Sequence, residues 1–183
     1  PRWSPDGRQI AFVSARDGSA QIWIAAVSSS GQIAGEPRKL TGLATEAGGP
    51  KWSPDGRWIA FTSDVYPECS TIACNDAKLE EHASAKSKAH VFDHLLFRHW
   101  TFWKDGRYSH VFLVPSDGSA PPRDLTPGAA DVPPFSLGGP DDYAFSPDSR
   151  ELAFARKTAP VEAISTNSAL FLLDLTTPKP TAR

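Results

Sequence analysis

Short apolar segments alternate with turn signals along the whole chain. Runs such as Ile10–Val13, Ile22–Val27 and Val111–Val114 are rich in β-branched and aromatic residues, and Gly, Pro, Asp and Ser gather between them. Apolar runs of about four to eight residues bounded by turn residues are typical of buried β-strands. The pattern predicts an all-β protein built from short antiparallel strands.

One segment occurs three times. Residues 3–14 read WSPDGRQIAFVS, residues 52–63 read WSPDGRWIAFTS, and residues 145–156 read FSPDSRELAFAR. Pro sets φ near about −65° at the first turn position and Asp-Gly permits a positive φ, so the strand that ends at Trp or Phe reverses tightly. The Ile-Ala-Phe or Leu-Ala-Phe that follows predicts the next strand, which we expect to be buried.

A second hairpin signal completes each unit. In the first copy, Asp17-Gly18 precedes the run Ile22–Val27 and Lys39-Leu40-Thr41 follows it. In the second copy the same order is given by Asp105-Gly106, Val111–Val114 and Arg123–Thr126. Each unit therefore predicts four antiparallel strands, which is the content of one β-propeller blade. Trp3 and Trp52 are 49 residues apart, which agrees with the roughly 40–50 residues of such blades.

These units predict a partial β-propeller of about three four-stranded antiparallel blades, with a partly helical insertion in the middle blade. The expected bounds are about 1–51, 52–130 and 140–183. Propellers usually close with about four to eight blades, so three blades form an open arc. An open arc leaves blade faces and strand edges uncovered, and we expect such a chain to self-associate.

The insertion lies at residues 64–104. It separates the second and third strands of the middle blade by about 39 residues more than in the first blade. Asn75 or Asp76 is expected to cap a helix that runs from Ala77 to about His90. Residues 91–103 are densely aromatic and predict a strand or a packed loop.

Charge and hydropathy exclude two classes of function. Lys and Arg number 19 against 21 Asp and Glu, so the net charge of −2 does not fit a protein that binds nucleic acid through its phosphates. No apolar run approaches the roughly 20 residues that span a bilayer, so membrane insertion is not expected. The chain contains no Met and begins inside a repeat, and we therefore expect it to be a piece of a longer protein.

The repeat resembles the short propeller repeat shared by TolB and by the prolyl oligopeptidase family of serine peptidases. Other segments resemble the propeller of bacterial dipeptidyl-peptidase and acylaminoacyl-peptidase-like members of that family. They are VYPEC at 65–69, ACN at 73–75, LLFRHWTFWKDG at 95–106, SHVF at 109–112, DLTPG at 124–128, AFSPD at 144–148 and STN at 165–167. The chain departs from the family at Ile164, where an aromatic residue is expected before Ser-Thr-Asn.

The resemblance implies a two-domain serine peptidase. In that family an N-terminal propeller covers the active site of a C-terminal α/β-hydrolase domain and admits short peptides by size. The catalytic Ser, Asp and His would lie in the second domain of the same polypeptide. The chain contains no Gly-x-Ser-x-Gly, the turn that exposes the nucleophile of such hydrolases, so we expect no catalytic residue, no cofactor and no activity from this chain alone.

Two other functions remain open. One is a TolB-like propeller that binds a protein partner and has no enzymatic activity, and the other is a structural repeat without a ligand. The insertion favours the peptidase, because a docking propeller has no need of a long excursion inside one blade. The residue preference of the substrate, and the choice between dipeptidyl and acylaminoacyl release, are not encoded in any motif here.

The candidate substrate-binding residues lie in the insertion. Arg98, Trp100 and Trp103 could hold a carboxylate or carbonyl against an apolar wall. The alternative is that the two indoles belong to the core while Arg98 bonds to loop carbonyls. Glu80 and Glu81 could bind the free amino terminus of a peptide, or they could be the solvated face of a helix.

Cysteine and histidine are both concentrated in the same region. Cys69 and Cys74 are close enough for a disulfide, which would fit a periplasmic or secreted protein, whereas free thiols would fit the cytoplasm. The five histidines lie between His82 and His110. His90 and His94 have the spacing of two ligands on one helix face, but no His-Glu-x-x-His occurs and we expect no metal site.

Overall fold

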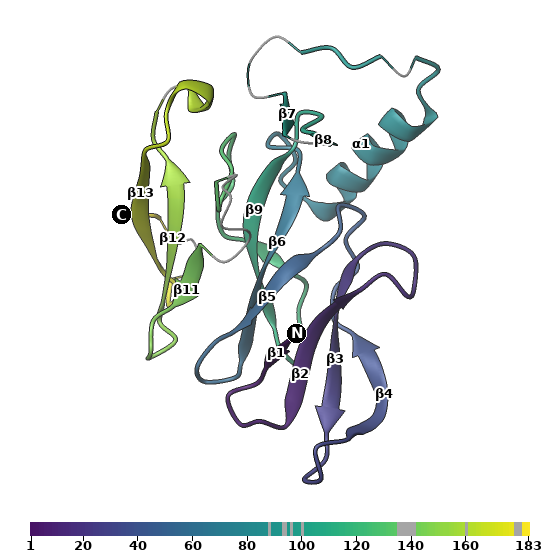
Figure 1. Ribbon diagram of the computed structural model, residues 1–183, viewed down its shortest axis with the longest axis vertical. Helices are drawn as coiled ribbons and strands as arrows, with labels where there is room; N and C mark the ends of the chain where they lie inside the picture. The colour runs from purple at the N-terminus through teal and green to yellow at the C-terminus, as the bar shows by residue number, and fades with distance from the viewer. Residues whose placement is uncertain are drawn as a thin grey trace.

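Three antiparallel sheets stand side by side in the computed structural model (Figure 1). The structure describes residues 1–87, 89–92, 95, 97–99, 101–134, 142–159, 161–177 and 181–183. The first sheet contains four strands in chain order, and these are β1 (Arg2–Trp3), β2 (Gln9–Ser14), β3 (Gln21–Val27) and β4 (Ile33–Lys39).

The middle sheet carries the insertion. Its strands in spatial order are β5 (Gly48–Trp52), β6 (Trp58–Val65), β9 (Tyr108–Pro115) and β10 (Arg123–Asp124). Between β6 and β9 the chain forms α1 (Ile72–Ser84) and a small hairpin of β7 (Arg98–His99) and β8 (Phe102–Trp103). The third sheet has three strands within the described residues, β11 (Tyr143–Phe145), β12 (Glu151–Lys157) and β13 (Ser168–Asp174), and η1 (Glu162–Ile164) lies between the last two.

The expected fold class is therefore confirmed. The chain is mostly β, its sheets repeat one meander, and a partly helical insertion follows the second strand of the middle sheet. The third sheet differs from the four-stranded expectation by one strand within the described part of the chain.

Two apolar layers hold the three sheets together. One layer lies between the first and middle sheets and includes Ile24, Ile59 and Phe61. The other lies between the middle and third sheets and includes Leu113 and Leu152. Because side chains alternate across a strand, the middle sheet contributes to both layers, and this explains why its strands read as continuous apolar runs.

The repeated turn is built the same way three times. Its Ser Oγ donates to the Asp Oδ1 two residues later, at 2.6 Å in each copy, and accepts from a backbone N–H five residues on, at 2.9 Å in each copy. The Ser4 hydroxyl lowers the pKa of the Asp6 carboxyl, and the Ser146 hydroxyl lowers that of Asp148. The motif thus closes the β1–β2, β5–β6 and β11–β12 hairpins by local contacts alone.

The helix of the insertion begins earlier than expected. Its N-cap is Thr71, whose Oγ1 accepts from the Cys74 backbone N–H at 3.2 Å, and the helix ends at Ser84 instead of continuing to His90. The expected caps, Asn75 and Asp76, both lie inside the helix. Asn75 uses its amide for a tertiary contact, which no local pattern indicates. Within the aromatic segment 91–103, the described strand residues form only the short β7–β8 hairpin.

Candidate functional site

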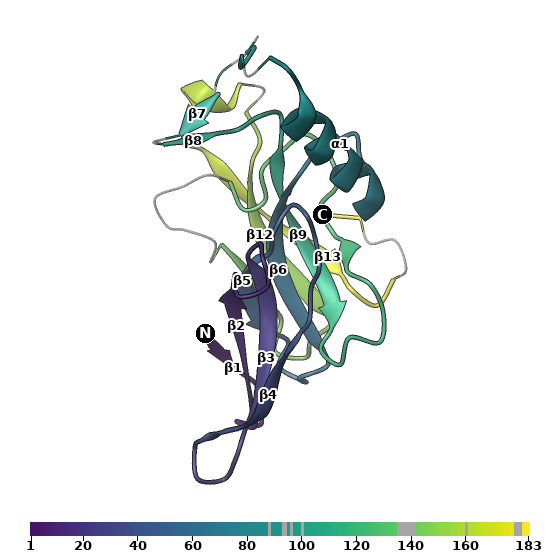
Figure 2. The same cartoon turned by 90° about the vertical axis from the view of Figure 1, so that its right-hand side faces the viewer.

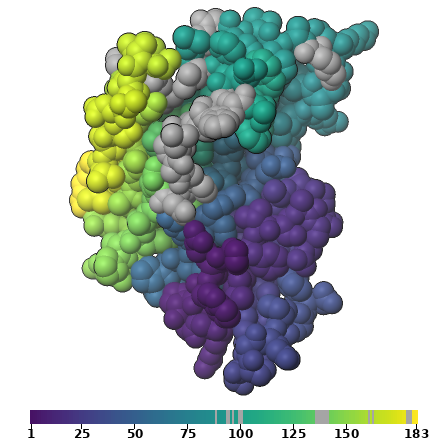
Figure 3. Space-filling view, in the orientation of Figure 1, coloured from purple at the N-terminus to yellow at the C-terminus, as the bar shows by residue number. Residues whose placement is uncertain are grey.

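The insertion forms one end of the molecule. α1 and the β7–β8 hairpin lie beyond the end of β6 and the start of β9 in both ribbon views (Figures 1 and 2). In the space-filling view this teal region projects past the sheets (Figure 3). The residues singled out from the sequence as binding residues all belong to this insertion.

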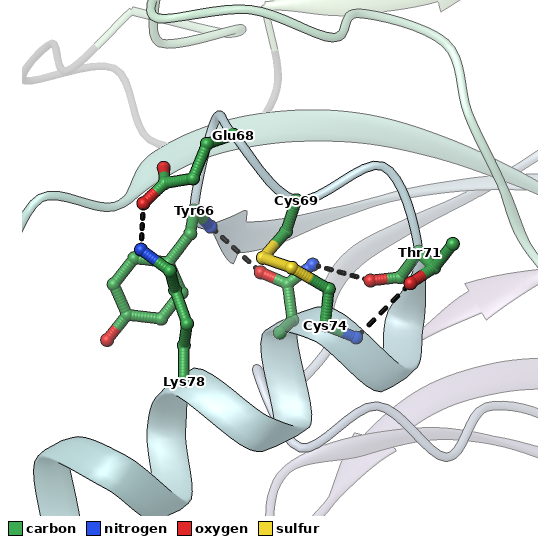
Figure 4. The surroundings of a disulfide bond; sticks show 7 residues. Tyr66, Glu68, Cys69, Thr71, Cys74 and Lys78 are labelled. Atoms are coloured by element: carbon green, nitrogen blue, oxygen red, sulfur yellow. Dashed lines mark hydrogen bonds and ion pairs between the residues drawn. A yellow bond between two sulfur atoms is a disulfide. The ribbon is translucent and has the colours of Figure 1, made fainter.

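α1 is attached to the middle sheet through its N-terminal half. Cys69 and Cys74 form a disulfide with their Cα atoms 5.4 Å apart (Figure 4). Asn75, the one buried residue of the helix, accepts from the Tyr66 backbone N–H at 2.8 Å and donates to the Thr71 carbonyl at 3.1 Å. The bridge and the amide therefore fix the first turn of α1 against the end of β6.

A second attachment lies one turn further along the helix. Lys78 forms an ion pair with Glu68, and its Nζ lies 5.1 Å from the centre of the Tyr66 ring (Figure 4). The hydrogen bond from Lys78 lowers the pKa of the Glu68 carboxyl. His82 contacts the same tyrosine ring, with centroids 5.5 Å apart. Tyr66 is thus the surface on which the middle of the helix rests.

Glu80 and Glu81 lie on the exposed part of α1. Within the described residues, no hydrogen bond or ion pair joins them to the hairpin. The structure therefore does not bring the two glutamates together with Arg98 and Trp103.

Four rings form the centre of the candidate site. We define the hairpin cluster as His90, Phe92, Phe97 and Trp103. The Trp103 ring stacks on His90 with centroids 4.9 Å apart and on Phe92 at 5.6 Å, and Phe92 stacks on Phe97 at 5.0 Å. The ring planes in these pairs differ by 13° to 29°, so the rings are close to parallel, an offset-stacked geometry that aromatic pairs favour.

Two charged residues flank the hairpin cluster. The guanidinium carbon of Arg98 lies 5.5 Å from the centre of the Trp103 ring, within the range of a cation–π contact. Two residues after the end of β8, Asp105 Oδ1 lies 2.9 Å from His90 Nδ1. This contact holds residues 89–92 against the hairpin. The predicted Arg98–Trp103 pair is therefore present in space, whereas Trp100 lies outside the described residues.

The hairpin cluster is open to solvent. Trp103 is 40% exposed and Phe97, whose ring stacks on it at 6.3 Å, is 38% exposed, whereas the exposed Phe102 lies on the other face of the hairpin. Contiguous exposed aromatic surface is uncommon on a folded protein and usually marks a binding region. The interpretation of the Trp103 indole as blade core is therefore wrong.

The sequence does not indicate four members of the site. Phe92 and Phe97 are only parts of the aromatic segment 91–103, His90 is only a candidate metal ligand at the end of the expected helix, and Asp105 is only part of a turn. The available signal was that aromatic density beside an Asp-Gly turn. The partners themselves could not be assigned, because His90 and Asp105 are brought together by the path of the loop between them.

Buried charges support the base of the hairpin. Lys104 forms an ion pair with Asp131, whose Oδ1 accepts from the Ser109 backbone N–H at 2.9 Å. The ammonium of Lys104 also lies 4.6 Å from the centre of the Tyr108 ring. Since Asp131 is buried, this pair ties the end of the insertion to the loop that leads toward the third sheet.

His110 is part of the same support. The residue is 1% exposed. Its Nδ1 lies 2.7 Å from Asp124 Oδ2 and its Nε2 lies 2.8 Å from the Gly128 carbonyl oxygen. Burial lowers the pKa of His110 and is the largest single influence on it, but the hydrogen bond and charge of Asp124, the Gly128 carbonyl and the charge of Asp131 together outweigh burial, so the pKa is raised. The histidine is thus a packed structural residue with two acceptors.

The described residues offer few other groups for chemistry. Within the part of the chain that the structure describes, no group of three His, Cys, Asp or Glu residues is placed to hold a metal ion. His94, the proposed partner of His90 in that interpretation, lies outside the described residues. No helix among the described residues has the length and apolar character to cross a membrane. What the arrangement offers is an exposed surface of rings and one guanidinium, which suits binding.

Comparisons with known proteins agree with the repeats. No protein-family model matches the chain. Dipeptidyl-peptidase 5 of Porphyromonas endodontalis is 27% identical over 181 residues, which cover 97% of this chain and 25% of that protein. The chain therefore spans about a quarter of the length of this curated relative.

Solved structures show the same fold. The uncomplexed acylaminoacyl peptidase of Pyrococcus horikoshii superposes with a TM-score of 0.62 at 13% identity, over 100% of this chain and 24% of that one. TolB from Acinetobacter baumannii gives a TM-score of 0.53 at 17% identity, over 100% of this chain and 33% of that one. The chain thus resembles the β-propeller part of peptidases of the prolyl oligopeptidase family and shares its fold with TolB.

Proposed function

We propose that this chain is the non-catalytic propeller part of a serine exopeptidase. In this role it gates and orients short peptides for an α/β-hydrolase domain of the same polypeptide. The sequence similarity to a dipeptidyl-peptidase extends over nearly the whole chain. The observation that carries the proposal is the insertion, which presents Arg98 on the exposed Trp103 ring.

The two residues suit complementary parts of a peptide. A guanidinium donates a fork of N–H groups to a carboxylate or carbonyl oxygen. The Trp103 and Phe97 rings offer apolar surface beside it. A peptide held at both points would have a defined direction along the hairpin, which is what orientation requires.

Glu80 and Glu81 are proposed to attract the free amino terminus of a peptide. Consecutive helix residues point about 100° apart, so one of the two would face a given ligand. Both side chains are exposed on α1. The alternative is that they form only a solvated helix face, in which case substitution of Glu80 or Glu81 would leave peptide binding unchanged.

A periplasmic or secreted location is part of the proposal. The support is the bridge between Cys69 and Cys74, since disulfides persist in oxidising compartments and are rare in the cytosol.

A TolB-like binding propeller is the second candidate. Its support is the fold shared with TolB. The reading frame that encodes this chain separates the two candidates. Downstream of Arg183 we expect a Gly-x-Ser-x-Gly segment followed by an Asp and a His. A reading frame that ended without these residues would favour the binding propeller.

Peptide binding tests the site directly. Titration calorimetry with di- to tetrapeptides should show binding to the chain, and Arg98→Gln should weaken it by roughly tenfold or more, since a hydrogen bond to a charged group contributes about 1.5–3 kcal/mol. Arg16→Gln is the matched control, because the Arg16 guanidinium lies 5.0 Å from the Trp23 ring in the first sheet. An equal loss of peptide affinity in Arg98→Gln and Arg16→Gln would contradict a binding site at the hairpin.

A further inference from the structure

The two halves of the insertion differ in charge. Residues 64–85 contain one Lys and five acids, whereas residues 86–104 contain four Lys or Arg and one acid, so the whole insertion carries a net −1. The acid that follows this second half, Asp105, is engaged by His90. The segment 86–104 is therefore the basic half of the insertion, and it contains the hairpin cluster.

The cations of this segment are not equivalent. Lys104 is engaged by the buried Asp131 at the base of the hairpin. Arg98 instead lies on the exposed Trp103 ring, and the exposed Phe97 ring stacks on the same indole at 6.3 Å. The exposed surface therefore combines one planar guanidinium with open aromatic rings.

A single carboxylate is the anion that fits this surface. The guanidinium fork matches a carboxylate in a bidentate manner, and a neighbouring large apolar side chain would cover the rings. Nucleic acid is bound by a row of cations that follows several phosphates. Anionic membranes recruit clusters of about four to eight basic residues. Among the residues that the structure describes here, Arg98 is the cation that contacts the Trp103 ring, and neither arrangement is formed by them.

We propose that the hairpin cluster with Arg98 selects peptides that carry an Asp or Glu side chain next to a large apolar residue. The inference rests on the proposed function and goes further, because it names the class of substrate and the residue that determines it. Arg98 reads the carboxylate, and Trp103 and Phe97 bind the apolar neighbour. Peptides of equal length with Gln or Lys in place of the acid bind more weakly.

Three labelled peptides of one length test this specificity. They share an Ala-Phe-X-Ala-Ala sequence with amidated carboxyl ends, where X is Glu, Gln or Lys, so that the side chain is the one carboxylate present. Fluorescence polarisation with the whole chain should rank Glu above Gln by roughly tenfold, as expected for a charge-assisted hydrogen bond. The ratio should fall as salt is raised, because the contact lies at the surface.

Variants assign the effect to residues. Arg98→Gln should bring the Glu and Gln peptides to equal affinity, because the Glu peptide loses a charge-assisted hydrogen bond and is weakened more than the Gln peptide. Arg98→Lys should retain part of the preference for the Glu peptide over the Gln peptide, because lysine keeps the positive charge but lacks the bidentate guanidinium. Phe97→Ala should weaken all three peptides, whereas Phe102→Ala, on the other face of the hairpin, and Arg16→Gln should change none of them.

The possible outcomes are distinct. Equal binding of the Glu and Gln peptides by the unmodified chain would overturn the specificity and leave the peptide-orienting function in place. Binding of none of the three would contradict both. Tighter binding of phosphatidylserine vesicles or of a DNA duplex than of the Glu peptide, at the same salt, would show that the basic segment serves a different partner and would overturn the proposal.

Discussion

At the scale of single residues, the third copy of the repeated turn is the most informative. Its turn has Ser149 where the other copies have Gly7 and Gly56, and all three residues have a positive φ, 62°, 69° and 73°. A side chain in this conformation is strained. Here the strain is offset, because the Asp55 backbone N–H donates to Ser149 Oγ at 3.0 Å and links the turns of two sheets.

We predict opposite behaviour for two substitutions at this position. Ser149→Ala keeps the strain and leaves the Asp55 N–H without its acceptor, so the free energy of unfolding should fall by about 1–2 kcal/mol. Ser149→Gly loses the same bond but relieves the backbone, so its loss should be smaller. Urea denaturation measures both. Gly7→Ser is the control, since it adds backbone strain without a new hydrogen-bond partner and should destabilise the chain. A free energy of unfolding that is the same in Ser149→Ala as in the unmodified chain would contradict this explanation.

His110 makes stability depend on pH. Both of its partners, Asp124 Oδ2 and the Gly128 carbonyl, are acceptors, so both ring nitrogens donate only when the imidazole is protonated. The folded-state pKa is raised above that of the unfolded chain. This contribution is therefore fully present below about pH 6.5 and is lost as the pH rises through the folded-state pKa.

The measurement is the difference in unfolding free energy between the unmodified chain and His110→Gln at several pH values. The difference should be largest in mild acid and should shrink toward alkaline pH. Asp124→Asn should flatten this dependence, because the carboxylate is the main cause of the raised pKa. A difference that grew with pH would show that the buried ring is neutral.

At the scale of elements, strands were predicted far better than the helix. Each strand of the repeat has its own turn signal and its own apolar run, so the information is local. α1 depends on tertiary contacts. Its first turn is held by the Cys69–Cys74 bridge and by the buried amide of Asn75, and a helix of this length is marginal without such support.

We predict that reduction releases α1 without unfolding the sheets. A bridge that closes so short a loop is expected to stabilise the segment by about 2 kcal/mol. In Cys69→Ser with Cys74→Ser, hydrogen exchange should become faster in Ile72–Ser84 and stay unchanged in β6 and β9. Lys78→Ala serves as the comparison, because it removes the Glu68 ion pair but leaves the bridge. Unchanged exchange in α1 would show that Asn75 holds the helix alone.

At the scale of the whole molecule, the two outer sheets differ from the middle one in what covers them. The middle sheet is packed on both faces. β13 in the third sheet carries Leu170, which is 82% exposed, and Leu172 on the same side of the strand. Exposed leucines at alternate positions form an apolar strip, which favours association.

We predict that the chain in isolation self-associates through β13. Sedimentation velocity should show species larger than the monomer, whose fraction rises with concentration. Leu170→Glu with Leu172→Lys should shift the distribution toward the monomer. Phe102→Ala alters the insertion and leaves β13 intact, so it should not change the distribution of species if Leu170 and Leu172 are responsible for association. A monodisperse monomer at all concentrations would contradict the prediction.

The sheets and their stacking could be derived from the amino-acid sequence, because each Ser-Pro-Asp turn is closed by its own side chains and each blade repeats the same pattern. Contacts between residues distant along the chain required the folded structure. The His90–Asp105 contact, the support of His110 and the start of α1 at Thr71 depend on loops that are not repeated. The Ser149 link depends on how two copies of the repeated turn meet between sheets. Local preferences fix the first group, whereas the second depends on the path that each loop takes across its neighbours.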